Sequence, residues 1–228
     1  MKLIVITTET FFEGEAEALN LLFDKGLELL HIRKPFASRQ ETKVLIGQIS
    51  KNFHARIVIH DNYELAQLFN LKGIHLNRRK QQFLQPFNPS TPSTSSTFST
   101  PLTSSTLSTS SLPSTFSISC SCHSLEELSE SQFCDYIFLS PIFDSLSKAG
   151  YKHGFTSEQL KEAKFRKIIN DRVIALGGIT TKNIPLAYSY GFGGVAVIGA
   201  LWSDFDVSRN FIKLQERFNE LIVNCSTV

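Results

Sequence analysis

The sequence predicts a single α/β domain of the (β/α)₈ class, a TIM barrel. Short apolar runs alternate with helical segments, the pattern of parallel strands joined by helices. Two runs near the C-terminus end in small residues and glycine, VIALGGIT at 173–180 and GFGGVAVIGALW at 191–202. Glycine lets backbone N–H groups approach a ligand, and the loops after the last two strands often bind phosphate in such barrels. A chain of 228 residues is long enough for one barrel.

Composition and charge exclude several broad classes of function. The net charge is +2 and 19% of the residues are charged, which argues against general binding to nucleic acid or to a membrane surface. No run approaches the roughly 18 apolar residues of a membrane span, and the N-terminal run is too short for an export signal. We therefore expect a cytoplasmic protein whose four cysteines are reduced and serve as small core or strand residues.

The first third of the chain supplies four strands. We expect them at 2–7, 29–33, 56–60 and 73–76, with helices at 13–25, 38–52 and 62–69 between them. Gly26 is well placed to end the first helix, and Ser38 and Asn62 are placed to cap the second and third helices.

A Ser/Thr/Pro-rich segment at 88–117 interrupts this pattern. Such a composition cannot bury enough apolar surface to offset the entropy of ordering it. We interpret the segment as a disordered or loosely packed insertion in the fourth βα unit, within one domain that covers 1–228. A linker between two domains is the competing interpretation, but neither flank is long enough to close a barrel alone.

The remaining four strands follow the insertion. They are expected at 118–122, 136–139, 173–176 and 194–198, with helices beginning near 124 and spanning 157–165, 181–190 and 206–224. Ser124 and Glu127 form the sequence pattern of a capping box, and Thr180 or Thr181 is placed to cap the next helix.

Polar side chains follow most of the strands, at the barrel end where active sites lie. Arg33 offers a planar fork for a phosphate or carboxylate, and Lys148 lies on a loop that could close over an anion. His123 can transfer a proton near neutral pH, and Asp61 can bind Mg²⁺ with water completing the shell. The other candidates at this rim are His31, His60, Asn77, Arg78, Ser145 and Ser147.

Each candidate also has a structural interpretation. His31, His60 and His75 could equally satisfy the carbonyl groups of nearby loops. Asp61 could cap the next helix, and Arg33 could pair with a neighbouring carboxylate. The functional interpretation therefore depends on the convergence of these side chains at one rim.

The order of motifs along the chain resembles the thiamine phosphate synthase/TenI family. The resemblance covers nearly the whole chain except the insertion, and its strand-six motif with a downstream lysine is fairly specific. The motifs are HIRK from 31, HDN from 60, GIHL from 73, SCHSLEEL from 121, DYIFLSPIFDSLSK from 135, ALGGIT from 175 and GVAVIGALW from 194.

The resemblance implies one of two reactions on a thiazole phosphate. A synthase joins an aminopyrimidine diphosphate to the thiazole phosphate and releases diphosphate, with Mg²⁺ as its cofactor. A TenI-type tautomerase moves a proton to aromatise a thiazole phosphate carboxylate and requires no cofactor. Both would bind the thiazole phosphate at Gly177, Gly178 and Gly199, and the family suggests a homodimer.

Several positions depart from the synthase pattern. Synthases usually carry Gln-x-Arg-x-Lys after the second strand, where this chain has His31, Arg33 and Pro35. They usually carry Asn-Asp after the third strand, where His60 precedes Asp61. The position of a second metal-binding aspartate is Lys80, which should weaken Mg²⁺ binding by its charge.

These departures favour a TenI-type tautomerase, in which His123 would carry the proton. The synthase is the alternative, because Arg78, Arg79 and Lys80 could neutralise a diphosphate directly. A third hypothesis is a non-catalytic protein that binds ligands of the thiamine pathway and regulates a partner.

Overall fold

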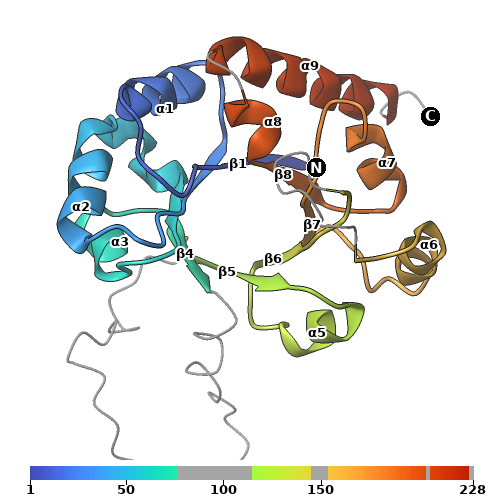
Figure 1. The fold of residues 1–228 in the computed structure, drawn as a ribbon. Coiled ribbons are helices and arrows are strands. Elements are labelled where there is room, and N and C mark those ends of the chain that lie inside the picture. The colour runs from blue at the N-terminus through green and yellow to red at the C-terminus, as the bar shows by residue number, and fades with distance from the viewer. Residues whose placement is uncertain (77–114, 145–153, 204–205, 226–228) are drawn as a thin grey trace, which may run out of the picture.

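The computed structural model describes residues 1–76, 115–144, 154–203 and 206–225, and these form a closed parallel barrel (Figure 1). Each strand pairs with the next in the sequence, and the last pairs with the first. The predicted fold class is therefore confirmed. The strands are β1 (Lys2–Ile6), β2 (Leu29–Ile32), β3 (Ile57–Ile59), β4 (Gly73–Leu76), β5 (Ser117–Cys122), β6 (Tyr136–Leu139), β7 (Val173–Leu176) and β8 (Gly194–Val197).

The helices lie outside the strands, as Figure 1 shows. They are α1 (Glu15–Asp24), α2 (Arg39–Gln48), the 3₁₀ helix η1 (Lys51–Arg56), α3 (Glu64–Leu68), α5 (Leu125–Glu130), α6 (Ser157–Phe165), α7 (Ile184–Ser189), α8 (Gly199–Trp202) and α9 (Val207–Cys225). None of the described helices is both long enough and apolar enough to cross a membrane.

Local sequence signals explain several helix ends. The Ser38 hydroxyl accepts a hydrogen bond from the backbone N–H of Glu41, and the Glu41 carboxylate accepts one from Ser38 in return. This capping box fixes the start of α2. Gly26 follows α1 with φ of 95°, a conformation that glycine adopts without steric cost.

Two predicted caps are wrong because other contacts determine those helix ends, and the predicted capping box at Ser124 forms only in part. Asn62 has φ of 53° and donates to the Thr42 hydroxyl, and α3 begins at Glu64 without a side-chain cap. Neither predicted threonine caps α7, which begins at Ile184 after Asn183. The Ser124 hydroxyl does accept from Glu127 N–H, but the Glu127 carboxylate accepts from the N–H of His123 at 2.7 Å instead of closing the capping box.

The β4–β5 pair places the boundary of the insertion. The two strands pair directly, from Gly73 with Ser117 to Leu76 with Cys120. Ser117 is therefore the first residue of β5, and the predicted boundary at 117 runs one residue too far. Residues 88–114 of the predicted insertion lie outside the described residues.

The core has two parts. Most buried apolar side chains pack between the strands and the helices, and Cys120, Cys122 and Cys134 are buried, unpaired members of this layer. A smaller cluster fills the inside of the barrel. It consists of Ile4, Ile6, Tyr136, Phe138, Ile174 and Ala196. The predicted role of these three cysteines as small core residues is confirmed.

Candidate functional site

The C-terminal ends of the strands carry the candidate residues that the structure describes. These are His31, Arg33, His60, Asp61, His123, Gly177, Gly178 and Gly199. The remaining candidates, Asn77, Arg78, Ser145, Ser147 and Lys148, lie outside the described residues, as does Lys80. Their predicted roles stay predictions.

The glycine pair after β7 adopts backbone conformations that suit glycine. Gly177 has φ of 93° and Gly178 has φ of 63°. A Cβ atom at 178 would lie 2.3 Å from the carbonyl oxygen of Asp144, so no larger residue fits without displacing that loop. The carbonyl of Gly178 accepts a hydrogen bond from the Asn183 amide at 2.8 Å. The turn is therefore held rigidly beside the loop that follows β6.

Gly199 is the first residue of α8, a short helix that the sequence analysis missed. The sequence signal is weak because the helix has four residues and directly continues the apolar run of β8. An extra short helix after the last strand is a common part of phosphate sites in (β/α)₈ barrels.

Arg33 lies at the end of β2 and forms an ion pair with Glu9, with 2.6 Å between Nη1 and Oε1. The predicted structural alternative, pairing with a carboxylate, is therefore present. The two side chains are 36% and 42% exposed, so the guanidinium also faces solvent. A guanidinium has five N–H donors, and one ion pair leaves others available for a ligand.

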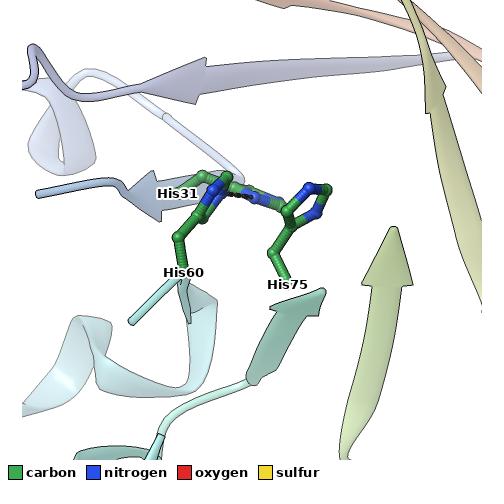
Figure 2. Close-up of side chains that lie close together, drawn as sticks. All are labelled: His31, His60 and His75. Carbon is green, nitrogen blue, oxygen red and sulfur yellow. Dashed lines mark hydrogen bonds between the residues drawn. The ribbon is translucent and has the colours of Figure 1, made fainter. Parts of the chain in front are cut away.

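Three histidines converge inside the barrel (Figure 2). His31 comes from β2, His60 follows β3 and His75 comes from β4. His31 Nδ1 lies 2.9 Å from His60 Nε2, and the rings of His60 and His75 stack with 4.1 Å between their centroids. Their exposed fractions are 0%, 8% and 2%, so His60 lies nearest to solvent.

Hydroxyl groups satisfy the other nitrogens of the two deeper rings. His31 Nε2 lies 2.7 Å from the Tyr136 hydroxyl. His75 Nδ1 and Nε2 lie 2.9 Å and 2.8 Å from the hydroxyls of Ser119 and Ser121. Burial holds the pKa of His31 well below its usual value, with a smaller effect of His75. Burial, and then the charge of Arg33, lowers the pKa of His75 to about 3.

The sequence analysis offered two roles for these histidines, ligand contact at the rim or hydrogen bonds to loop carbonyls. The surroundings of His31 and His75 match neither role. The ring nitrogens of His31 and His75 contact side chains, not loop carbonyls. His31 lies beneath the rim, so ligand contact at this point would come through His60. The cluster was missed because His31 and His60 are 29 positions apart and meet only when the barrel closes.

His123 lies at the end of β5 and is exposed. Its Nδ1 lies 2.9 Å from the carbonyl oxygen of Ser140. A carbonyl oxygen only accepts, so the neutral ring carries its proton on Nδ1 and leaves Nε2 as the basic nitrogen. This orientation fits the predicted role in proton transfer.

Asp61 follows His60 and is half-buried at the same rim. Burial raises the pKa of the Tyr63 hydroxyl, and the negative charge of Asp61 raises it further. Mg²⁺ prefers oxygen ligands and often uses one or two carboxylates together with phosphate oxygens of the substrate. Asp61 is therefore suited to bind Mg²⁺, and its predicted role as a metal ligand stays a prediction.

Lys34 is a buried residue to which the sequence analysis assigned no role. Its Nζ lies 2.7 Å and 2.9 Å from the two carboxylate oxygens of Glu15 and 2.7 Å from the carbonyl of Thr10. The two charged side chains are 1% and 2% exposed. The sequence holds one signal for its burial. Lys34 follows Arg33 directly, so its side chain starts on the opposite face of the strand from Arg33.

A closed parallel barrel with polar and glycine residues at one rim has the architecture of the (β/α)₈ enzymes. A profile described as thiamine monophosphate synthase matches residues 106–201. A crystal structure of thiamine phosphate pyrophosphorylase from Bacteroides thetaiotaomicron is 37% identical, with a TM-score of 0.74, and the match covers 96% of this chain and 98% of that one. The chain belongs to the thiamine monophosphate synthase/TenI family.

Two more distant proteins agree with this assignment. Thiamine-phosphate synthase from Methanoculleus marisnigri is 25% identical over 222 residues, which cover 94% of each chain. Thiamine phosphate pyrophosphorylase from Pyrococcus furiosus is 21% identical with a TM-score of 0.67, over 96% of each chain, and this likeness concerns the fold.

Proposed function

We propose that this protein is a thiamine-phosphate synthase, which joins an aminopyrimidine diphosphate to a thiazole phosphate and releases diphosphate. The observation that carries the proposal is the match, at 37% identity and over almost the full length of both chains, to a thiamine phosphate pyrophosphorylase. The named relatives thus favour the reaction that the sequence analysis held as the alternative.

The thiazole phosphate would bind at the glycine end of the rim. The turn at Gly177 and Gly178 and the start of α8 at Gly199 lie after adjacent strands, β7 and β8. Their backbone N–H groups suit a phosphate. Ser145, Ser147 and Lys148 are proposed to complete this site from the loop after β6.

The diphosphate would bind across the rim, near the ends of β2 and β3. Arg33 would donate to its oxygens, and Asp61 would hold Mg²⁺ together with water and diphosphate oxygens. The ion would supply positive charge toward the leaving diphosphate. His60, Asn77 and Arg78 are proposed to contact the substrate at this end, with His31 beneath them.

A second candidate is the tautomerase, because the geometry of His123 favours it. Its exposed ring is oriented by the Ser140 carbonyl, with Nε2 as the basic nitrogen. The backbone N–H of His123 also donates to the Glu127 carboxylate, with 2.7 Å between the two atoms. This contact fixes the backbone that carries the ring. A general acid/base of this kind contributes roughly 10²–10⁴-fold to a rate.

A parallel assay tests the two reactions. Given both phosphate substrates, we expect the purified chain to form thiamine phosphate and diphosphate in a Mg²⁺-dependent way. Asp61→Asn should reduce this rate by roughly 100-fold, because it removes a group that stabilises charge in the transition state. The same substitution should weaken the Mg²⁺-dependent binding of diphosphate measured by calorimetry.

His123→Ala provides the discriminating variant. It should leave thiamine phosphate formation within a few-fold of the unchanged chain if the synthase proposal is right. Aromatisation of the thiazole phosphate carboxylate that is lost in His123→Ala, without thiamine phosphate formation, would replace the synthase by the tautomerase. Binding of thiazole phosphate without either turnover would identify a non-catalytic binding protein.

A further inference from the structure

The inside of this barrel is polar on one side, along β2 to β5 and the first residue of β6. (β/α)₈ barrels usually fill this space with layers of bulky branched side chains. Here, Ile4, Ile6 and Ile174 fill the part near β1 and β7. Imidazole and hydroxyl groups fill the other side, from residues His31, His60, His75, Ser119, Ser121 and Tyr136.

The three histidines bring ring nitrogens that can ligate a metal close together. One ring nitrogen from each of His31, His60 and His75 can be chosen so that all three lie within 4.8 Å of one another. The side chains arise from three neighbouring strands of the barrel, so the backbone holds their spacing (Figure 2). Burial disfavours the charged imidazolium, which leaves neutral rings with lone pairs on nitrogen.

We propose that His31, His60 and His75 form a binding site for a transition-metal ion of the Zn²⁺, Co²⁺ or Ni²⁺ type. Three imidazoles are a recurrent ligand set for Zn²⁺, with the fourth position left to water or another ligand. Nitrogen donors favour these ions over Mg²⁺, which prefers oxygen. The site is therefore distinct from the magnesium role of Asp61, and the inference does not depend on the proposed synthase reaction.

Neighbouring hydroxyls supply the outer contacts that such a site needs. A metal-bound histidine usually hydrogen-bonds through its second nitrogen, which fixes the tautomer and the ring orientation. The Tyr136 hydroxyl at 2.7 Å would keep this role for His31 Nε2 while Nδ1 binds the ion. One of the serine hydroxyls on His75 would keep the same role for that ring.

Metal binding requires a small, specific rearrangement. Zn–N bonds of about 2.0–2.1 Å at tetrahedral angles separate two ligand nitrogens by about 3.3 Å. The 2.9 Å contact between His31 Nδ1 and His60 Nε2 would therefore open and be replaced by the ion. The His60 ring would also leave its stack on His75, because a metal lies in the plane of each imidazole ligand. His60 is the most exposed of the three and can turn from the rim.

Metal titration of the full chain tests the inference. After removal of bound metal with a chelator, Co²⁺ is added and its visible absorption is followed, and Zn²⁺ is then added as a competitor. We expect one equivalent of Co²⁺ per chain to bind, with a spectrum of nitrogen ligation, and Zn²⁺ to displace it. Elemental analysis of the desalted protein gives the stoichiometry independently.

Two substitutions remove ligands with little risk to the fold. His31→Gln and His60→Asn introduce the residues that the synthase pattern carries at these positions, so a polar side chain stays in the barrel. Each should weaken Co²⁺ binding by at least about 100-fold, since even the loss of an outer contact costs 10–100-fold. His123→Ala, an exposed histidine of the same rim, is the matched control and should keep full affinity.

The outcomes are decisive because folding is measured separately by circular dichroism. Failure of the folded, unchanged chain to bind Co²⁺ or Zn²⁺ tightly would overturn the inference. Binding that persists in the His31→Gln/His60→Asn double variant would overturn it too, because the ion would then bind elsewhere. Neither result depends on whether thiamine phosphate is formed.

Discussion

The buried charge of Lys34 illustrates how single side chains hold the rim in place. Its ammonium group contacts the Glu15 carboxylate, which anchors the start of α1 to the end of β2. Burial lowers the pKa of Lys34 and raises that of Glu15, while the contact between them opposes both shifts. Arg33 lies next in the chain, so this pair also fixes the backbone that presents a proposed substrate contact.

Removing one partner of this pair should destabilise the protein strongly. Glu15→Gln leaves a buried ammonium without its counter-charge, and we expect a loss of about 3–5 kcal/mol in the free energy of unfolding. The double variant Glu15→Leu/Lys34→Met should recover most of the loss, because it leaves no buried charge. Urea denaturation measures both.

An exposed ion pair gives the contrast for that experiment. Arg39 and Glu64 lie 3.0 Å apart with side chains 53% and 40% exposed. Arg39→Gln should therefore cost less than about 1 kcal/mol. A Glu15→Gln variant no less stable than Arg39→Gln would contradict the assignment of a buried pair.

At the scale of elements, the turn between β7 and α7 has a requirement for glycine that can be measured. Gly178→Ala adds a Cβ at φ of 63° and only 2.3 Å from the carbonyl oxygen of Asp144. We expect a loss of about 1–3 kcal/mol in the free energy of unfolding, together with weaker binding of thiazole phosphate. Thermal unfolding and calorimetry check the two effects.

Gly47→Ala is the matched control. Gly47 lies in α2, and a Cβ there would meet nothing within 4 Å. Alanine favours a helix over glycine by up to about 1 kcal/mol, so this variant should be slightly more stable and bind ligand normally. If Gly178→Ala behaved like Gly47→Ala, the turn would have room for a side chain and the close contact would be wrong.

The elements also show what a single sequence can predict. The centres of most strands follow from buried apolar runs, although β5 alternates serine with isoleucine and cysteine. The helix α6 begins as predicted because Thr156 and Gln159 form a local capping box. Asn62 failed as a cap because its side chain bonds to Thr42, 20 positions earlier. Such contacts exist only after the barrel closes.

The same reason limits prediction of the candidate site. The position of Asp61 and Arg33 at the rim follows from strand ends, which are local features. The inward direction of His31 and His75 depends on strand register, and their contact with Tyr136 and Ser119 depends on closure. A sequence reading that assigns alternate strand residues to the barrel interior would have placed both histidines inside.

At the scale of the whole molecule, closure of the barrel depends on the direct pairing of β4 with β5. The two strands are separated by residues 77–116, yet they pair in register as neighbours. A parallel connection needs a crossover of about a dozen residues. The connection between β4 and β5 is longer than this minimum. We therefore expect the barrel to close without the additional residues.

Deletion of residues 88–112 tests this argument. Residues 77–87 and 113–116 then remain to make the crossover, which meets the length that parallel strands need. We expect the shortened chain to keep its circular dichroism spectrum and to unfold within a few degrees of the full chain, because loop closure costs change slowly with length. If the deletion abolished folding, the segment would contribute to the barrel itself. If the variant folded normally but lost thiamine phosphate formation, the segment would act at the rim, since its root follows β4 on the side where the candidate site lies.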